Sequence, residues 1–183
     1  MNAIFKGLRP LDYALAALAT AAGVLMMYLD ITARAHGLPH PQSTTTAAML
    51  PVFLAVTVPV LWRRRNILAV TGITAVAAAV HVALFGWNTR CGVVIPLSFA
   101  LCYAVARFAV GWRRHLLALA LILVLLVVTL ARDASISTMT GALPIAIPGC
   151  ALFYGTGRLV QARVNRKQPA AVAAAAVSAG TSA

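Results

Sequence analysis

The hydrophobic positions of this chain fall into long runs that short polar turns separate. A helix needs roughly 20 apolar residues to cross a hydrocarbon core of about 30 Å. The runs of about this length cover residues 11–29, 44–61, 67–87, 92–109, 116–131 and 141–159. Because a helix satisfies its own backbone hydrogen bonds in lipid, the pattern predicts an all-α, polytopic membrane bundle of six transmembrane helices.

Two of the runs contain prolines. Pro51 and Pro59 lie in the second run, and Pro144 and Pro148 lie in the sixth. Proline has no amide donor and its ring crowds the preceding turn, so it tends to kink a helix. We therefore expect the second and sixth spans to be bent.

The end of the chain has a different composition from the runs. It is rich in alanine after Pro169, and its side chains are too small and its length too short for a span or a core. We expect a six-span transmembrane domain over residues 1–167 and a disordered Ala-rich cytoplasmic tail over residues 168–183.

The composition places the chain in a bilayer. Hydrophobic residues make up 62% of it, charged residues 10%, and Asp12, Asp30 and Asp133 are its three acids. A soluble domain keeps roughly a quarter of its residues charged to cover its surface. The net charge of +12 could indicate nucleic-acid binding, but the bases form short clusters between apolar runs, so we expect no nucleic-acid partner.

The basic residues are distributed unequally between the two ends of the predicted spans. The richer side holds Lys6, Arg9, Arg63, Arg64, Arg65, Arg107, Arg113, Arg114, Arg158, Arg163, Arg166 and Lys167. The other side holds Arg34, Arg90 and Arg132. Lys and Arg are retained on the cytoplasmic side during insertion. We therefore expect a multi-pass protein of the plasma membrane with its N- and C-termini in the cytoplasm.

The first run has an alternative interpretation as a cleaved signal peptide. Lys6 and Arg9 precede it, and the small-residue sequence Ala33-Arg34-Ala35 follows it. The run is longer than the roughly 7 to 15 apolar residues of a usual signal core, and cleavage would leave five spans. We favour retention of the first span.

Two stretches carry a family resemblance. In residues 50–80 a proline-containing run ends in consecutive arginines, Pro59 and then Arg63 to Arg65; in residues 97–123 Tyr103, Val105, Ala106 and Arg107 precede Arg113 and Arg114. These patterns resemble the N-terminal membrane-embedded sensor (input) domain of actinobacterial two-component histidine kinases. The resemblance implies a sensing module. Such kinases continue into a phosphoacceptor His and an ATP-binding domain, whereas this chain has no His after His115. The resemblance therefore implies an input module that lacks the kinase core.

Several polar residues are candidates for contacts in or beside the membrane. His81, Tyr103 and Arg107 form a candidate intramembrane polar site, because ionisable groups at that depth are costly and often functional. Packing explains His81, and snorkelling explains Arg107, more readily than a binding role does. The arginine turns are candidates for lipid or partner contacts through Arg63, Arg64, Arg65, Arg113 and Arg114. His36, His40 and Cys91 offer a weak metal hypothesis without a fixed ligand spacing, so we expect no metal and no cofactor.

Two functions from different classes follow from these patterns. The first is a non-enzymatic sensing or scaffolding protein that acts by helix rearrangement, since no paired carboxylates or activated nucleophile are evident. Its expected partners are membrane lipids, a second copy of itself, or a separate kinase or response regulator. The second is a small transporter or facilitator built on paired hairpins, because Val60-Leu61-Trp62-Arg63-Arg64 and Val110-Gly111-Trp112-Arg113-Arg114 end two runs alike.

Overall fold

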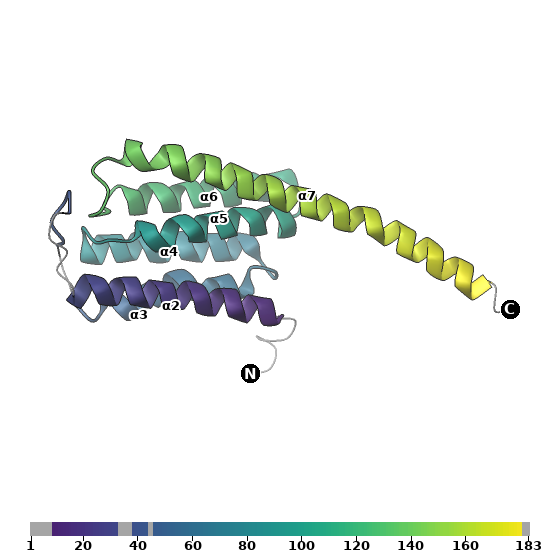
Figure 1. Cartoon of the computed structure of the whole chain (residues 1–183), viewed down its shortest axis with the longest axis horizontal. Coiled ribbons are helices and arrows are strands. Elements are labelled where there is room, and N and C mark those ends of the chain that lie inside the picture. The colour runs from purple at the N-terminus through teal and green to yellow at the C-terminus, as the bar shows by residue number, and fades with distance from the viewer. Residues whose placement is uncertain (1–8, 33–37, 44–45, 181–183) are drawn as a thin grey trace.

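The computed structural model describes residues 9–32, 38–43 and 46–180, with side-chain surroundings as far as Arg166, and it confirms the all-α class (Figure 1). The elements in chain order are α2 (Pro10–Thr32), α3 (Met49–Thr57), the 3-10 helix η1 (Val58–Trp62), α4 (Ile67–Phe85), α5 (Cys91–Phe108), α6 (Trp112–Leu130) and α7 (Met139–Gly180). Within the described residues, five of these helices, α2, α4, α5, α6 and α7, are long and apolar enough to cross a membrane.

The second predicted span is shorter than expected. The sequence predicts a helix over residues 44–61, but α3 begins at Met49 and passes into η1, which ends at Trp62. Nine α-helical and five 3-10 residues extend over about 24 Å, which is less than the roughly 30 Å of a hydrocarbon core.

The prolines explain part of this geometry. Pro51 lies in the first turn of α3, where an amide has no helical acceptor, so its missing N–H costs nothing there. Pro59 lies in the first turn of η1, where the α-helical ladder gives way to 3-10 hydrogen bonds. Pro144 and Pro148, by contrast, lie inside one continuous helix, α7.

The backbone of α7 remains helical to Gly180, where the sequence predicted a disordered tail from residue 168. Alanine has the highest helix propensity, so an Ala-rich segment extends a helix that has already begun, without the cost of a new nucleus. In Figure 1, α7 runs past the other helices at the end of the bundle where α2 begins.

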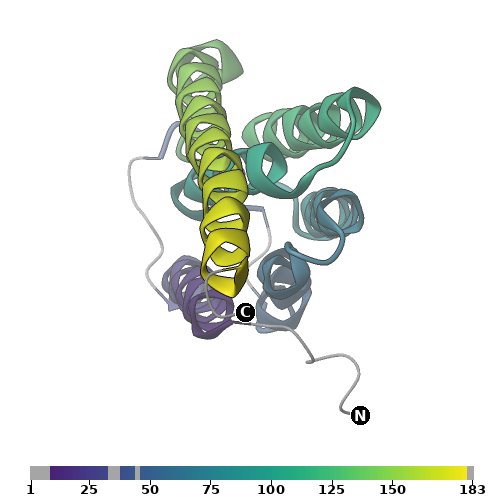
Figure 2. The same cartoon turned by 90° about the vertical axis from the view of Figure 1, so that its right-hand side faces the viewer.

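Helix α5 occupies the middle of the bundle (Figure 2). It contacts α2, α4, α6 and α7, while α4 also packs on α6 and α2 on α3. The core is apolar and includes the fully buried Val56, Val94, Leu101 and Leu125. Many of the outward-facing side chains are also large and apolar, for example Leu18, Val76, Leu84, Leu152 and Leu159. A surface of this kind is suited to lipid rather than to water.

Close contact between α5 and α7 depends on a glycine. A Cβ added to Gly157 would lie 2.8 Å from the backbone oxygen of Tyr103 and 2.7 Å from the Cβ of Ala106. Small residues let helix backbones approach closely where lipid supplies no hydrophobic driving force. Gly155, two residues earlier on α7, has open space where its Cβ would be.

We predict that Gly157→Ala destabilises the protein in detergent micelles, whereas the matched variant Gly155→Ala does not. The added methyl group at residue 157 forces α5 and α7 apart, which should cost about 1–3 kcal/mol, although alanine favours the helix at both positions. Thermal or SDS unfolding followed by circular dichroism measures this difference. Equal stability of the two variants would show that the close packing at Gly157 is not needed.

Candidate functional site

All three carboxylates of the chain are buried at the two ends of the bundle. Asp12 lies where α2 begins and α5 ends, which we call the basic end. Asp30 and Asp133 lie at the opposite end. A buried carboxylate is stable only when cations or N–H donors surround it, so each end must supply such partners.

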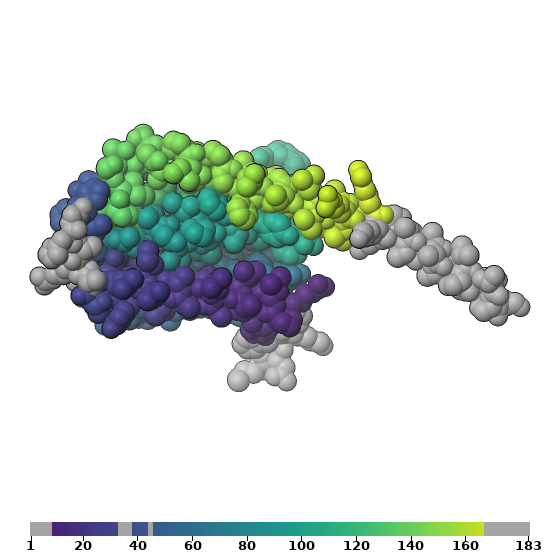
Figure 3. All heavy atoms as spheres, viewed as in Figure 1, coloured from purple at the N-terminus to yellow at the C-terminus, as the bar shows by residue number. Residues whose placement is uncertain are grey.

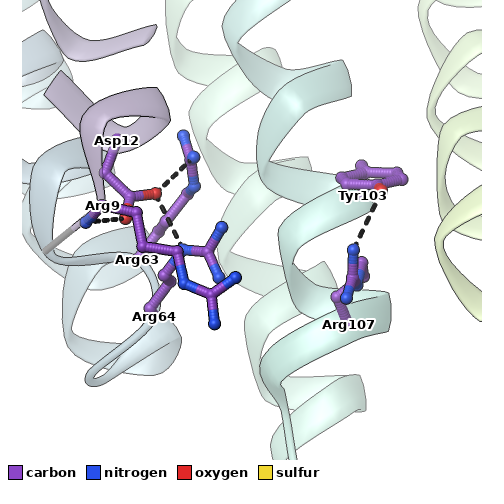
Figure 4. Close-up of polar contacts among 6 residues, drawn as sticks. All are labelled: Arg9, Asp12, Arg63, Arg64, Tyr103 and Arg107. Atoms are coloured by element: carbon purple, nitrogen blue, oxygen red, sulfur yellow. Dashed lines mark hydrogen bonds and ion pairs between the residues drawn. The ribbon is translucent and has the colours of Figure 1, made fainter. Parts of the chain in front are cut away.

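At the basic end, Asp12 joins α2 to the turn that follows η1 (Figure 4). Its Oδ1 accepts hydrogen bonds from Arg63 Nη2 at 2.6 Å and from Arg64 Nε at 2.9 Å. Its Oδ2 accepts one from the backbone N–H of Arg9 at 3.0 Å, which satisfies a donor at the start of the helix. Burial lowers the pKa of Arg63, and the neighbouring Asp12 opposes that shift.

Arg107 on α5 completes this group of arginines. Its Nη1 donates a long hydrogen bond of 3.4 Å to the hydroxyl of Tyr103, one helical turn earlier (Figure 4). The guanidinium carbons of Arg64 and Arg107 lie 5.1 and 5.6 Å from the ring centre of Phe108. We call Asp12, Arg63, Arg64, Tyr103, Arg107 and Phe108 the arginine corner. It brings together two of the three predicted intramembrane polar residues and two of the predicted lipid contacts.

A cavity of about 340 Å³ opens beside the arginine corner. Arg63, Arg64 and Arg107 line it together with apolar residues of α2 and α7 such as Leu11, Leu15 and Phe153. The size falls within the roughly 300–1,000 Å³ of small-molecule sites. Three guanidinium groups line this pocket, and one carboxylate, Asp12, binds two of them. The pocket is therefore positively charged and can accept an anionic group next to an apolar one.

At the opposite end, Arg90 connects several loops. It is 1% exposed, and its guanidinium donates to the carbonyl oxygens of Gly86 at 2.8 Å, Asn88 at 3.3 Å and Arg132 at 3.0 Å, and to Nδ1 of His81 at 3.0 Å. Burial lowers its pKa to about 10, while Asp133 and Asp30 oppose the shift, so the group stays protonated at neutral pH.

The carboxylates at this end bind backbone amides. Asp133 accepts from the N–H groups of Arg90 at 2.7 Å and Cys91 at 2.6 Å, and from the hydroxyl of Ser135 at 2.6 Å. Asp30 accepts from the N–H of Thr89 at 3.0 Å. These bonds fix the loop between α4 and α5 to the loop between α6 and α7 and to the end of α2.

His81 is placed apart from Tyr103 and Arg107. It is fully buried between the rings of Phe53 and Phe85, and its Nδ1 accepts the hydrogen bond from Arg90. A guanidinium only donates, so Nδ1 carries no proton and the Nε2 tautomer is present. The structure therefore places His81 with the loops of the opposite end, where it holds Arg90.

The other predicted contacts of the arginine turns lie toward solvent or lipid. Arg65 and Arg114 line a cleft of about 210 Å³ between the two turns. Arg113 is exposed, with its guanidinium over the ring of Trp112. These three arginines lie at the same end as Arg63 and Arg64 but do not line their pocket.

Within the described residues, no three His, Cys, Asp or Glu side chains lie together as metal ligands. The metal hypothesis therefore has no matching site there. His36 lies outside those residues. His40 packs against Trp87, with ring centres 4.1 Å apart, and the thiol of Cys91 lies 3.1 Å from the hydroxyl of Ser135.

Sequence reasoning missed the roles of Asp12 and Arg90. In the sequence, Asp12 is one of three scattered acids, and Arg90 is one of three bases on the side with fewer of them. The small number of acids was the available signal: among long apolar helices, each of the three acids needs a cation or several amides as partners. The sequence could not show which arginines are those partners, because 51 residues separate Arg63 from Asp12.

We predict that Arg90→Gln destabilises the fold by about 3 kcal/mol or more. The buried carbonyl oxygens that accept hydrogen bonds from Arg90, and the buried carboxylates beside it, would be left without their positively charged partner. Arg132→Gln is the matched control, because the Arg132 side chain is exposed and only its backbone oxygen takes part. Unfolding in detergent measures both, and an equal effect of the two substitutions would contradict the role given to Arg90.

Comparison with known proteins does not assign the chain to a family. No family model, no curated protein and no solved structure matches the chain. The likeness to histidine-kinase input domains therefore rests on the patterns in residues 50–80 and 97–123, and it is a hypothesis about function.

Proposed function

We propose that this chain is a non-enzymatic membrane protein of the sensing or scaffolding class, related in organisation to the input module of a two-component kinase. The observation that supports this proposal is a series of direct residue contacts that leads from the arginine corner to α7. It gives α2, the turn after η1 and α7 a shared set of contacts at the basic end.

The path consists of direct contacts. Asp12 of α2 binds Arg64, the guanidinium of Arg64 lies over Phe108 at the end of α5, and α5 packs on α7 where Gly157 meets Tyr103. A displacement of α2 relative to η1 therefore changes the surroundings of α7. Coupling between distant sites needs such a chain of packed and hydrogen-bonded groups with two arrangements.

The form of α7 supports an output role. It is one helix from Met139 to Gly180 and extends past the rest of the bundle at the basic end (Figure 1). A continuous helix transmits a shift or rotation from the membrane to whatever lies beside its far end. The proposed partners are membrane lipids, a second copy of the chain, and a separate kinase or response regulator.

The middle of the bundle favours this function over transport. Buried hydroxyl groups along α4, α5 and α6 donate to carbonyl oxygens of the protein: Thr71 to Ile67, Thr74 to Val56, Ser98 to Val94 and Thr129 to Leu125. Groups paired in this way are closed to a passing solute. A facilitator would instead present polar groups to a water-filled path between the helices.

The orientation that we propose places the basic end in the cytoplasm. Arg63, Arg64, Arg107, Arg113 and Arg114 all lie at this end, whereas Arg90 and Arg132 lie at the other. The positive-inside rule then puts both termini on the cytoplasmic side of the plasma membrane.

We predict that Asp12→Asn increases hydrogen–deuterium exchange in α7 between Gly157 and Arg166. Loss of the carboxylate releases Arg63 and Arg64, and the path through Phe108 loosens. Exchange measured by mass spectrometry in lipid nanodiscs reports each segment separately.

Asp30→Asn is the matched control, because it removes a buried carboxylate of α2 at the opposite end. It should raise exchange near Thr89 and leave residues 157–166 of α7 unchanged. An effect of Asp12→Asn confined to α2 and the arginine turn would contradict the proposed coupling.

A further inference from the structure

We propose that the pocket of the arginine corner binds one acidic membrane lipid, with the anionic headgroup between Arg63, Arg64 and Arg107 and an acyl chain along the groove between α2 and α5. The inference deepens the proposed function, on which it rests for the membrane setting, by naming the class of ligand that the basic end receives.

Charge is the first argument. Asp12 is shared by Arg63 and Arg64, and Arg107 forms no ion pair with any of the three carboxylates, all of which lie in the described part of the chain. The arginine corner therefore holds three cations and one anion, and the three cations line the pocket. Guanidinium groups form strong, often bidentate hydrogen bonds to phosphate and carboxylate oxygens, so an anion is the matching ligand.

The hydrogen bonding of Arg107 is the second argument. The side chain makes one long bond to Tyr103, and its Nε is buried without an acceptor among the described residues. Unsatisfied buried donors are rare in folded proteins. A guanidinium that the protein satisfies so poorly, beside an open pocket, is suited to a ligand that supplies acceptor oxygens.

The shape of the cavity is the third argument. A second cavity of about 280 Å³ continues from the pocket and shares Leu15, Arg63 and Ala100 with it. Its remaining walls are apolar and extend along α2 as far as Ala22 and along α5 as far as Gly92. From Leu11 to Ala22 the helix rises about 16 Å, which is close to the acyl depth of one leaflet.

Together the two cavities have the form of a lipid. The charged pocket lies at the basic end, where headgroups of one leaflet would be, and the apolar groove leads from it between α2 and α5. Figure 3 shows α2, α5 and α7 lying side by side on the face where these elements meet. A soluble anion would use the pocket but not the groove, so the groove identifies a lipid as the occupant.

The test is native mass spectrometry of the whole protein with phosphatidylglycerol and with phosphatidylcholine of identical acyl chains. The wild type should retain phosphatidylglycerol in preference to phosphatidylcholine. Arg107→Gln should weaken phosphatidylglycerol retention by about tenfold, the loss of one charge-assisted hydrogen bond. Arg113→Gln is the matched control, since Arg113 lies at the same end but outside the pocket.

The groove is tested separately. Ala100→Leu fills the space shared by both cavities and should reduce retention of both lipids, while Ala120→Leu, exposed on α6, should not. Glycerol phosphate, which has no acyl chain, should bind weakly to the wild type. These measurements test the site even if Arg107→Gln does not fold.

Three results would overturn the proposal. They are equal retention of the two lipids by the wild type, equal losses in Arg107→Gln and Arg113→Gln, and binding of glycerol phosphate as tight as that of the lipid. Retention as expected together with unchanged exchange in α7 of Asp12→Asn would keep the lipid site and contradict the sensing function. Increased exchange in α7 of Asp12→Asn, together with equal retention of the two lipids, would support the coupling and contradict the lipid site.

Discussion

A charge buried among apolar helices has to find its partner inside the protein, and this constraint shapes both ends of the bundle. The chain has three carboxylates, and each is buried. Asp12 fastens α2 to the turn after η1, while Asp133 fastens two loops to each other beside Arg90. The helices between these ends are held by apolar packing and by close approach at small residues.

Arginine side chains lie at both ends of the bundle, but their hydrogen bonding differs. At the opposite end, Arg90 is surrounded by carbonyl oxygens, by His81 and by nearby carboxylates, so its hydrogen bonds are used within the fold. At the basic end, Arg107 lacks a carboxylate and lines a cavity. An arginine whose guanidinium is hydrogen-bonded within the protein stabilises the fold. An arginine that lacks acceptors and lies beside a cavity is available to a ligand.

The sequence was sufficient for the long elements and insufficient for the contacts between them. Long apolar runs determined α2, α4, α5 and α6 to within a few residues, because a span in lipid needs length and apolarity above all. The start of the second helix at Met49 and the continuation of α7 to Gly180 were missed, since hydropathy reports neither proline placement nor helix propensity. Arg63, Arg64, Tyr103 and Arg107 were chosen from the sequence, but their convergence on one cavity depends on helix packing that no local pattern contains.

The proposed mechanism requires the basic end to lie at the cytoplasmic leaflet. Reporter fusions test this most directly, with an enzyme that is active only outside the cytoplasm placed either in the loop after Arg132 or after Arg166. The fusion after Arg132 should be active, and the fusion after Arg166 should be inactive. The opposite pattern would place the arginine corner on the outer side and contradict the proposed sensing mechanism.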